Sequence, residues 1–267
     1  MLGEFSTIKD RQISEKLKIT RNYRCAAVTA TYLDIWIMRR VVNYIRVGYS
    51  SASYAMWMLC RDIRRKPLDE LVQILDDKLA ADDVTFKGCP SKGRNGLDEL
   101  ALNQFSRRYI FHILARVTAF TEVGSGRGDT FDMLVDRKIK NPYDIEHIWS
   151  DDFISHQALF VTEQEFHEWR NHVASLLLLP ADVNRSLQAK SYTDKLPHYA
   201  KQNFYAASLS PVIYAHQPQF LKFKDDNGFP FKSHANYTKV EQQERRKLLA
   251  ALVEKIWDPD RLQEAAQ

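Results

Sequence analysis

Two separated stretches constrain the fold of this chain more than any other feature. The first, residues 143–148 (Tyr-Asp-Ile-Glu-His-Ile), is a short run rich in β-forming residues that ends close to an acidic residue and a histidine. The second, residues 173–186, starts with an apolar run to Leu179 and continues past Pro180 into a segment of helical character that carries Asn184. We therefore predict a strand, an excursion, a second strand and a helix, with polar side chains gathered where the first strand ends.

The excursion between the two predicted strands contains a helix start of its own. Thr162 is followed three residues later by Glu165, which is the spacing of a capping box. This pattern predicts a helix that runs through Asn171. The helix lengthens the connection, so the two stretches meet only if the strands pair.

Most of the remaining chain is predicted to be helical. Apolar residues recur at steps of three and four, as an amphipathic or buried helix requires. Residues 1–24 are polar and basic with little periodicity, and we expect them to be irregular. The fold class is therefore mainly α, a helical bundle with an embedded strand–strand–helix motif. The expected helices cover residues 26–47, 53–65, 67–80, 98–120 and 237–257.

A glycine-rich segment marks the predicted domain boundary. Residues 124–129 (Gly-Ser-Gly-Arg-Gly-Asp) lack the Gly-Lys-Ser/Thr ending of a P-loop and do not lie between a strand and a helix. We interpret the segment as part of a flexible linker. The expected organisation is a helical domain over 1–122, a linker over 123–141, and a second domain over 142–267 that includes the C-terminal helix.

Composition narrows the class of protein only slightly. The 267 residues carry a formal net charge of +4, which does not by itself indicate nucleic-acid binding. Cys25, Cys60 and Cys89 have no paired spacing, which argues against a disulfide framework or a cysteine-ligated zinc. The sequence shows no signal peptide and no apolar run long enough for a membrane span. We expect a cytoplasmic protein with no membrane partner.

The residues of the predicted hairpin fit the hydrolysis of a phosphodiester. Glu146 and the amide oxygen of Asn184 are suitable ligands for one hard divalent ion, Mg²⁺ or Mn²⁺. His147 points to the other side of the strand from Glu146, which suits a general base acting on the attacking water. Each piece alone also has a structural interpretation, since an acid–histidine pair is common and an asparagine near a helix start often caps it. Their conjunction favours a site.

These residues resemble a known family. Residues 145–148 are similar to the Asp/Glu-His-Ile-hydrophobic motif of HNH nucleases. Residues 173–195 are similar to the Gly-Asn-Leu-Thr-Leu-Leu…Asn…Phe-x-x-Lys block in the C-terminal nuclease domain of GmrSD-type, modification-dependent restriction endonucleases. The resemblance implies a ββα-metal (HNH) motif in which Glu146 and Asn184 bind the metal and His147 is the catalytic base. Lys195 would contact a phosphate or support the site.

The resemblance also implies an activity and partners. It predicts a metal-dependent HNH endonuclease that nicks or cuts double-stranded DNA in anti-phage restriction. Relatives carry an N-terminal nucleotide-hydrolysing domain with an Asp-Gly-Gln-Gln-Arg motif, which this sequence lacks. We therefore expect an N-terminal or separate sensor domain as a partner. The alternative is a non-catalytic helical module that binds DNA or protein and keeps a decayed HNH hairpin. Expected DNA contacts near the site are Arg170, Arg185, Lys190, Lys195 and Lys201.

Two departures from the family pattern single out accessory residues. Ser175 stands where the family has the Asn of Gly-Asn-Leu, so an orienting amide for the histidine is missing at that position. Residues 149–152 (Trp-Ser-Asp-Asp) replace the Pro-Gln that follows His-Ile, and Asp151 either adds a carboxylate ligand or caps the next helix. His172, just ahead of the second strand, is a further candidate for the site.

Overall fold

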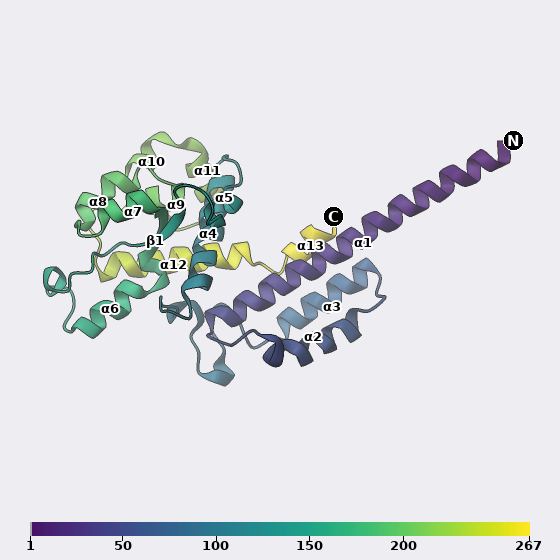
Figure 1. The fold of residues 1–267 in the computed structure, drawn as a ribbon, viewed down its shortest axis with the longest axis horizontal. Coiled ribbons are helices and arrows are strands. Elements are labelled where there is room, and N and C mark those ends of the chain that lie inside the picture. The colour runs from purple at the N-terminus through teal and green to yellow at the C-terminus, as the bar shows by residue number, and fades with distance from the viewer. Residues whose placement is uncertain (1) are drawn as a thin grey trace. The chain divides into compact units, whose positions relative to one another are not determined.

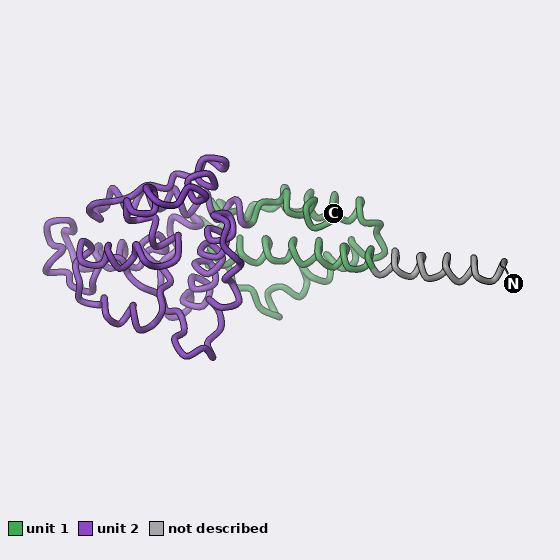
Figure 2. The backbone as a smooth tube through the Cα atoms, turned by 90° about the horizontal axis from the view of Figure 1, so that it is seen from above, with its two compact units in different colours: residues 1–94, 257–267 green, residues 95–256 purple. Residues whose placement is uncertain are grey.

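The computed structural model describes residues 2–267, with side chains described from Thr20 onwards. The chain divides into two compact units, shown in different colours in Figure 2. Unit 1 contains residues 1–94 and 257–267, and unit 2 contains residues 95–256. In the part of the chain that the structure describes, no helix has both the length and the apolar character needed to cross a bilayer.

Unit 1 is a small helical assembly built on one long helix. α3 and α13 both pack against α1, so the end of the chain returns to the helix with which it begins (Figure 1). Ile35 of α1 and Leu75 of α3 are fully buried, as the apolar periodicity of both segments predicts. The helices are α1 (Leu2–Val42), α2 (Tyr49–Ile63), α3 (Leu68–Ala80) and α13 (Arg261–Ala266).

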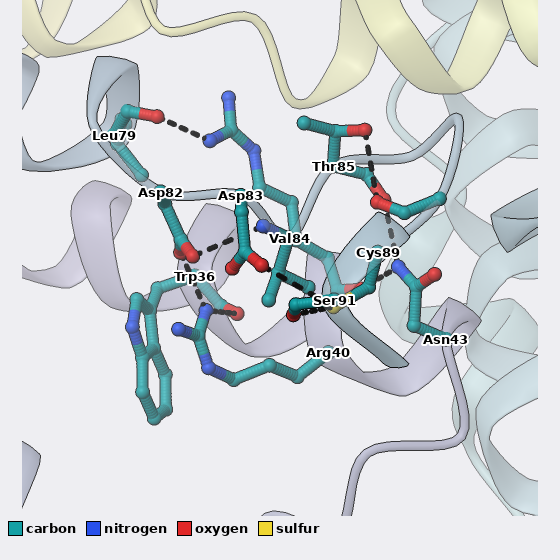
Figure 3. A network of polar contacts seen from close by, with 12 residues as sticks. Trp36, Arg40, Asn43, Leu79, Asp82, Asp83, Val84, Thr85, Cys89 and Ser91 are labelled. Carbon is teal, nitrogen blue, oxygen red and sulfur yellow. Dashed lines mark hydrogen bonds and ion pairs between the residues drawn. The ribbon is translucent and has the colours of Figure 1, made fainter. Parts of the chain in front are cut away.

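A network of polar contacts joins the C-terminal part of α1 to the loop after α3 (Figure 3). Arg40 forms an ion pair with Asp82 at 2.8 Å. Asn43, only 1% exposed, donates through Nδ2 to the carbonyls of Arg39 and Thr85, both at 2.7 Å. Asn43 thereby joins the end of α1 to the loop after α3, and it gives the Thr85 carbonyl a second donor beside the amide of Gly88. The network is therefore a structural support of unit 1.

Unit 2 surrounds a short hairpin with helices. α4 packs against α12 and against the second strand of the hairpin. Ile110, Ile113, Leu114 and Val117, which recur on one side of α4, are all fully buried. The helices are α4 (Arg107–Gly124), α5 (Phe131–Val135), α6 (Glu163–Asn171), α7 (Ala181–Leu187), α8 (Tyr192–Tyr199), α9 (Phe204–Ala207), α10 (Val212–His216), α11 (Pro218–Asp226) and α12 (Lys239–Ile256).

The hairpin consists of β1 (Tyr143–His147) and β2 (Leu176–Pro180), which pair in an antiparallel register. Tyr143 lies opposite Pro180, and His147 lies opposite Leu176. The four leucines of β2 are buried because α4, α7 and α9 pack against that strand. α7 starts directly after β2, so the predicted strand–excursion–strand–helix order and the mainly helical class are both confirmed.

Several element boundaries differ from the prediction for local reasons. Residues 2–24, expected to be irregular, belong to α1. The helix expected from residue 98 begins at Arg107, because Asn103 and Ser106 form a hydrogen-bonded turn just before it. β2 begins three residues late because Val173–Ser175 form a 3₁₀ turn, η4. The predicted helix start at Thr162 is confirmed, since its side chain accepts a hydrogen bond from the amide of Glu165, but the Glu165 carboxylate accepts from the amide of Val161, so the capping box is not closed.

The division between the two units lies earlier than the expected linker. The glycine-rich segment predicts a linker over 123–141, whereas the compact units separate between Arg94 and Asn95. The reason is α4, which contributes its apolar side to the core around β2 and therefore belongs to the unit of the hairpin. The C-terminal segment 257–267 belongs to unit 1, although the sequence analysis assigned it to the second domain.

Candidate functional site

A polar cleft of about 430 Å³ lies in unit 2 along the end of β1 and the start of α7. Glu146, His147 and Asn184, the three residues at the centre of the sequence hypothesis, all line it. β1 supplies the first two residues, and α7 supplies the third because that helix begins where β2 ends. The hairpin register therefore brings together side chains that are far apart in the sequence. Other lining residues include Arg107, Asp144, Asp151, Arg170, Arg185, Gln188 and Lys195.

Glu146 is a buried carboxylate with two partners on one helix. Its side chain is 3% exposed, and Oε1 lies 2.7 Å from the Nζ of Lys195. The hydroxyl of Tyr199 donates to the same Oε1 at 2.9 Å. Burial lowers the pKa of the Lys195 ammonium, and the charge of Glu146 opposes that shift. Among the described residues no hydrogen bond reaches Oε2, so one oxygen of Glu146 remains available to a ligand in the cleft.

His147 is held by an amide that ends α6. Its Nε2 lies 3.0 Å from the Oδ1 of Asn171. An amide oxygen only accepts, so Nε2 carries the proton and the neutral ring keeps its lone pair on Nδ1. Burial of the ring, and after it the nearby charge of Arg170, lower the pKa of His147 to about 4. The ring is therefore neutral near pH 7, which is the state that a general base requires.

Asn184 is fixed through its nitrogen. Nδ2 donates to the carbonyl of Ile145 at 3.0 Å, which ties α7 to the strand position next to Glu146. The amide plane is thereby set, and Oδ1 has no hydrogen-bond partner among the described residues. The second proposed ligand is thus a carbonyl-type oxygen that lines the same cleft as Glu146.

These donors fit a hard divalent cation that keeps much of its water. Mg²⁺ is commonly held by one or two protein oxygens, with water and phosphate filling the other positions. Glu146 Oε2 and Asn184 Oδ1 supply such a pair. The described residues contain no cluster of three or more His, Cys, Asp or Glu side chains that would form a complete protein cage. Lys195 already contacts the other oxygen of Glu146, so an ion would take Oε2.

Three of the predicted DNA contacts line the cleft and two do not. Arg170 donates to the carbonyl of Trp149 at 3.3 Å, and its other guanidinium nitrogen lies 3.6 Å from Asp151. Arg185 lies on α7 with an exposed side chain. Lys195 also lines the cleft, but it is 1% exposed and paired with Glu146, so its position matches the supporting role rather than a surface phosphate contact.

Lys190 and Lys201 lie outside the cleft lining. The Nζ of Lys190 lies 3.1 Å from the Nε2 of His198, and Lys201 borders a separate, smaller cavity. Their proposed DNA contacts therefore have no support from the geometry of the cleft.

Of the three predicted accessory residues, only Asp151 lines the cleft. Its side chain is 67% exposed and forms an ion pair with Arg170. A further carboxylate therefore lies in the same cleft as Glu146. His172, predicted as a further candidate for the site, does not line the cleft. Its Nδ1 accepts from the amide of Ala174 and its Nε2 contacts the carbonyl of Leu97, so both ring nitrogens serve the backbone.

Ser175, the other accessory residue of the prediction, serves the local backbone. Its hydroxyl donates to the Trp169 carbonyl at 2.9 Å, and its own carbonyl accepts from Ile148. The residue is fully buried and does not line the cleft. It holds the turn before β2 rather than orienting the histidine.

Sequence reasoning missed three residues of the site. Asn171 takes the contact with His147 that the family pattern places at position 175; an amide at the end of the predicted helix was the available signal. Tyr199 lies four residues after Lys195, on the same face of α8, which is a helical spacing that sequence alone offers. Arg107 lines the cleft from the first turn of α4, and no local pattern indicates this.

One comparison with known proteins finds a match. A family model described as GmrSD restriction endonucleases, C-terminal domain, matches residues 94–265. The match covers all of unit 2 and well over half of the chain. No curated protein and no solved structure matches the chain. The chain belongs to the family of GmrSD restriction endonuclease C-terminal domains, and its role is that of a restriction endonuclease.

Proposed function

We propose that unit 2 is a metal-dependent DNA endonuclease of the HNH, or ββα-metal, type that hydrolyses phosphodiester bonds in double-stranded DNA. One observation carries the proposal. An imidazole nitrogen, a carboxylate oxygen and an amide oxygen, each without a protein partner among the described residues, belong to side chains that line one cleft. Family membership supports the same conclusion, since it gives the chain a restriction endonuclease role.

His147 is the general base of the proposed reaction. Its Nδ1 removes a proton from water as the water oxygen forms a bond to phosphorus. The bond between phosphorus and the 3′ oxygen breaks, which leaves a 5′ phosphate on one side of the nick and a 3′ hydroxyl, protonated from solvent, on the other. A positioned base of this kind contributes on the order of 10²–10⁴-fold to the rate. Asn171 orients the ring and fixes its tautomer.

Glu146 and Asn184 are the proposed ligands of one Mg²⁺ or Mn²⁺ ion. When bound, such an ion offsets the charge that develops on the phosphate and on the departing oxygen. Lys195 and Tyr199 hold the carboxylate of Glu146 in place from α8. The bond from Asn184 to Ile145 aligns the amide oxygen before any ligand arrives, so little reorganisation accompanies binding.

The cationic side chains around the cleft hold the DNA backbone. Arg170 and Arg185 line the cleft and offer guanidinium donors suited to phosphate oxygens. One site of this type acts on one strand at a time, so a nick is the expected product of a single visit. Cutting of both strands then requires a second visit or a second copy. We extend the proposal to a nucleotide-hydrolysing sensor domain, on the same chain or separate, as the partner that controls access.

Nicking of supercoiled plasmid tests the proposal. The full chain is incubated with Mg²⁺, with Mn²⁺ or with EDTA, alongside His147→Ala and the matched control His167→Ala, whose ring lies on the exposed side of α6. We expect relaxation that needs the ion, disappears in His147→Ala and persists in His167→Ala. Equal activity in both variants would overturn the assignment. DNA binding without any ion-dependent relaxation would favour the non-catalytic module instead.

A further inference from the structure

A second pocket lies beside the proposed nuclease cleft. It has a volume of about 810 Å³ and is formed by the turn before α4, the first turns of α4, the segment after α5 and the start of β1. Arg107 and Asp144 line both the pocket and the cleft, so the two hollows are adjacent. Its size falls within the range of small-molecule sites in proteins, about 300–1,000 Å³. The nuclease reaction described above makes no use of it.

The pocket combines positive charge with an exposed aromatic ring. Arg107, Arg108 and Arg137 line it, and Asp144 is the carboxylate among its lining residues. Asp144 lies 3.4 Å from Arg137 and 4.0 Å from Arg107, and both arginine side chains remain more than half exposed. One carboxylate does not neutralise three guanidinium groups, so the pocket favours an anion.

Phe105 gives the pocket its second character. The side chain is 76% exposed, although an exposed phenyl ring usually gains nothing from water contact. Its backbone is firmly held, since the amides of Phe105 and Ser106 both donate to the Oδ1 of Asn103, at 2.9 and 3.0 Å. The ring is therefore displayed on an ordered turn at the mouth of the pocket. Phe111 adds a second ring, with the guanidinium of Arg137 5.5 Å from its centre.

We propose that this pocket binds an unpaired nucleotide, with its base stacked on Phe105 and its phosphate held by the arginines. A nucleotide joins an aromatic face to a phosphate, which is the combination that the lining matches. In a paired duplex the faces of the bases are covered by stacking, so the ligand must be displaced or single-stranded. This nucleotide belongs to the DNA strand whose phosphates enter the neighbouring cleft, a step that rests on the proposed function.

Binding in EDTA tests this without any need for cleavage. The full chain is titrated against two labelled duplexes that are identical except for one bulged nucleotide, and anisotropy reports affinity. We expect the bulged duplex to bind about fivefold or more tightly, because stacking of one base on an aromatic side chain is worth roughly five- to a hundredfold. Phe105→Ala should remove that preference and Phe105→Tyr should keep it. Ile154→Ala, at a position that is 77% exposed, is the matched control and should keep it.

Two further arms decide what occupies the pocket. A 5-iodouracil in the bulge should cross-link to the peptide that carries Phe105, mapped by mass spectrometry. Deoxyadenosine monophosphate alone should compete only weakly, because it lacks the flanking phosphates. Equal affinity for the two duplexes, a preference that survives Phe105→Ala, or a free nucleotide that binds as tightly as the bulged DNA would each overturn the inference. Plasmid nicking is measured separately, so an unchanged chain that nicks DNA but shows no preference for the bulged duplex would overturn the pocket assignment alone.

Discussion

Two asparagines, one in each unit, both donate through Nδ2 to backbone carbonyls, but the surroundings of their side-chain oxygens differ. Asn43 donates through Nδ2 to two backbone carbonyls, and its Oδ1 is buried without a hydrogen bond. Asn184 donates through Nδ2 to the carbonyl of Ile145, and its side chain lines an open cleft. Both side chains tie distant segments together, but only one has an oxygen that a ligand reaches. Access, rather than bonding pattern, separates the structural amide from the candidate ligand.

Replacing the cleft amide should give the largest effect. Asn184→Ala removes the oxygen proposed to bind the ion, whose stabilisation of developing charge is worth several kcal/mol. We expect the initial rate of plasmid nicking at saturating Mg²⁺ to fall by about 100-fold or more. Circular dichroism should show a fold close to that of the unchanged protein. An unchanged nicking rate would make Asn184 a structural residue like Asn43 and end the contrast between them.

The reciprocal change in unit 1 should affect stability instead. Asn43→Ala leaves the carbonyls of Arg39 and Thr85 without their side-chain donor inside the unit. We expect the free energy of unfolding, measured by urea titration, to fall by about 1–3 kcal/mol. Nicking per folded molecule should stay unchanged. A loss of nicking at a temperature where the variant is fully folded would contradict the assignment of this network as purely structural.

A third asparagine, Asn171, differs from both, because it acts on the site indirectly by holding the ring of His147. Asn171→Ala removes the acceptor that orients the ring, and we expect kcat to fall by about tenfold while KM for plasmid changes little. Asn171→Asp keeps an acceptor and should restore part of the rate. Because the added carboxylate favours protonated imidazole, it should also move the acid limb of the pH–rate profile upward. A role in folding alone would leave that limb where it is.

His147 and His172 differ as the asparagines do: His147 lines the cleft, whereas the ring of His172 supports the fold. The stability that His172 contributes therefore depends on pH. Burial lowers the pKa of His172 to about 3, and its ring nitrogens are both engaged by the backbone. Because the pKa of His172 in the folded protein lies below its usual value of about 6.5, the neutral ring contributes its full stabilisation above about pH 6.5. This contribution is lost progressively as pH falls from about 6.5 towards 3.

The smallest expected effect follows from this titration. In EDTA, His172→Gln should reduce the slope of unfolding free energy against pH by up to about 1.4 kcal/mol per pH unit between pH 6 and 4. Ile154→Ala, which changes an exposed side chain that does not titrate, should leave the slope unchanged. Parallel slopes for all three proteins would show that His172 ionises in the folded state as readily as in the unfolded one.

The sequence predicted the parts of the site that local patterns encode. The short run of β-forming residues located β1, and the apolar run that continues into a helical segment located β2 and α7. The conjunction of Glu146, His147 and Asn184 in this order, together with the family resemblance, identified them as a group. The partners of these residues depend on tertiary packing. The proximity of Lys195 to Glu146 depends on how α8 packs, and the place of Arg107 depends on α4 lying beside the hairpin. The same packing made the expected linker part of unit 2.

The bond between Asn184 and the Ile145 carbonyl has a consequence for how this region tolerates change. A shift of one residue between β1 and β2 would exchange the faces of Glu146 and His147, because strand side chains alternate. The hydrogen bond of Asn184 depends directly on that alignment, because its acceptor is the carbonyl of Ile145, next to Glu146. Lengthening the loop that leads into α6 leaves the alignment intact, whereas gaining or losing one residue inside either strand dismantles it. The length of the loop before α6 can therefore vary, in evolution or by design, whereas the lengths of β1 and β2 cannot.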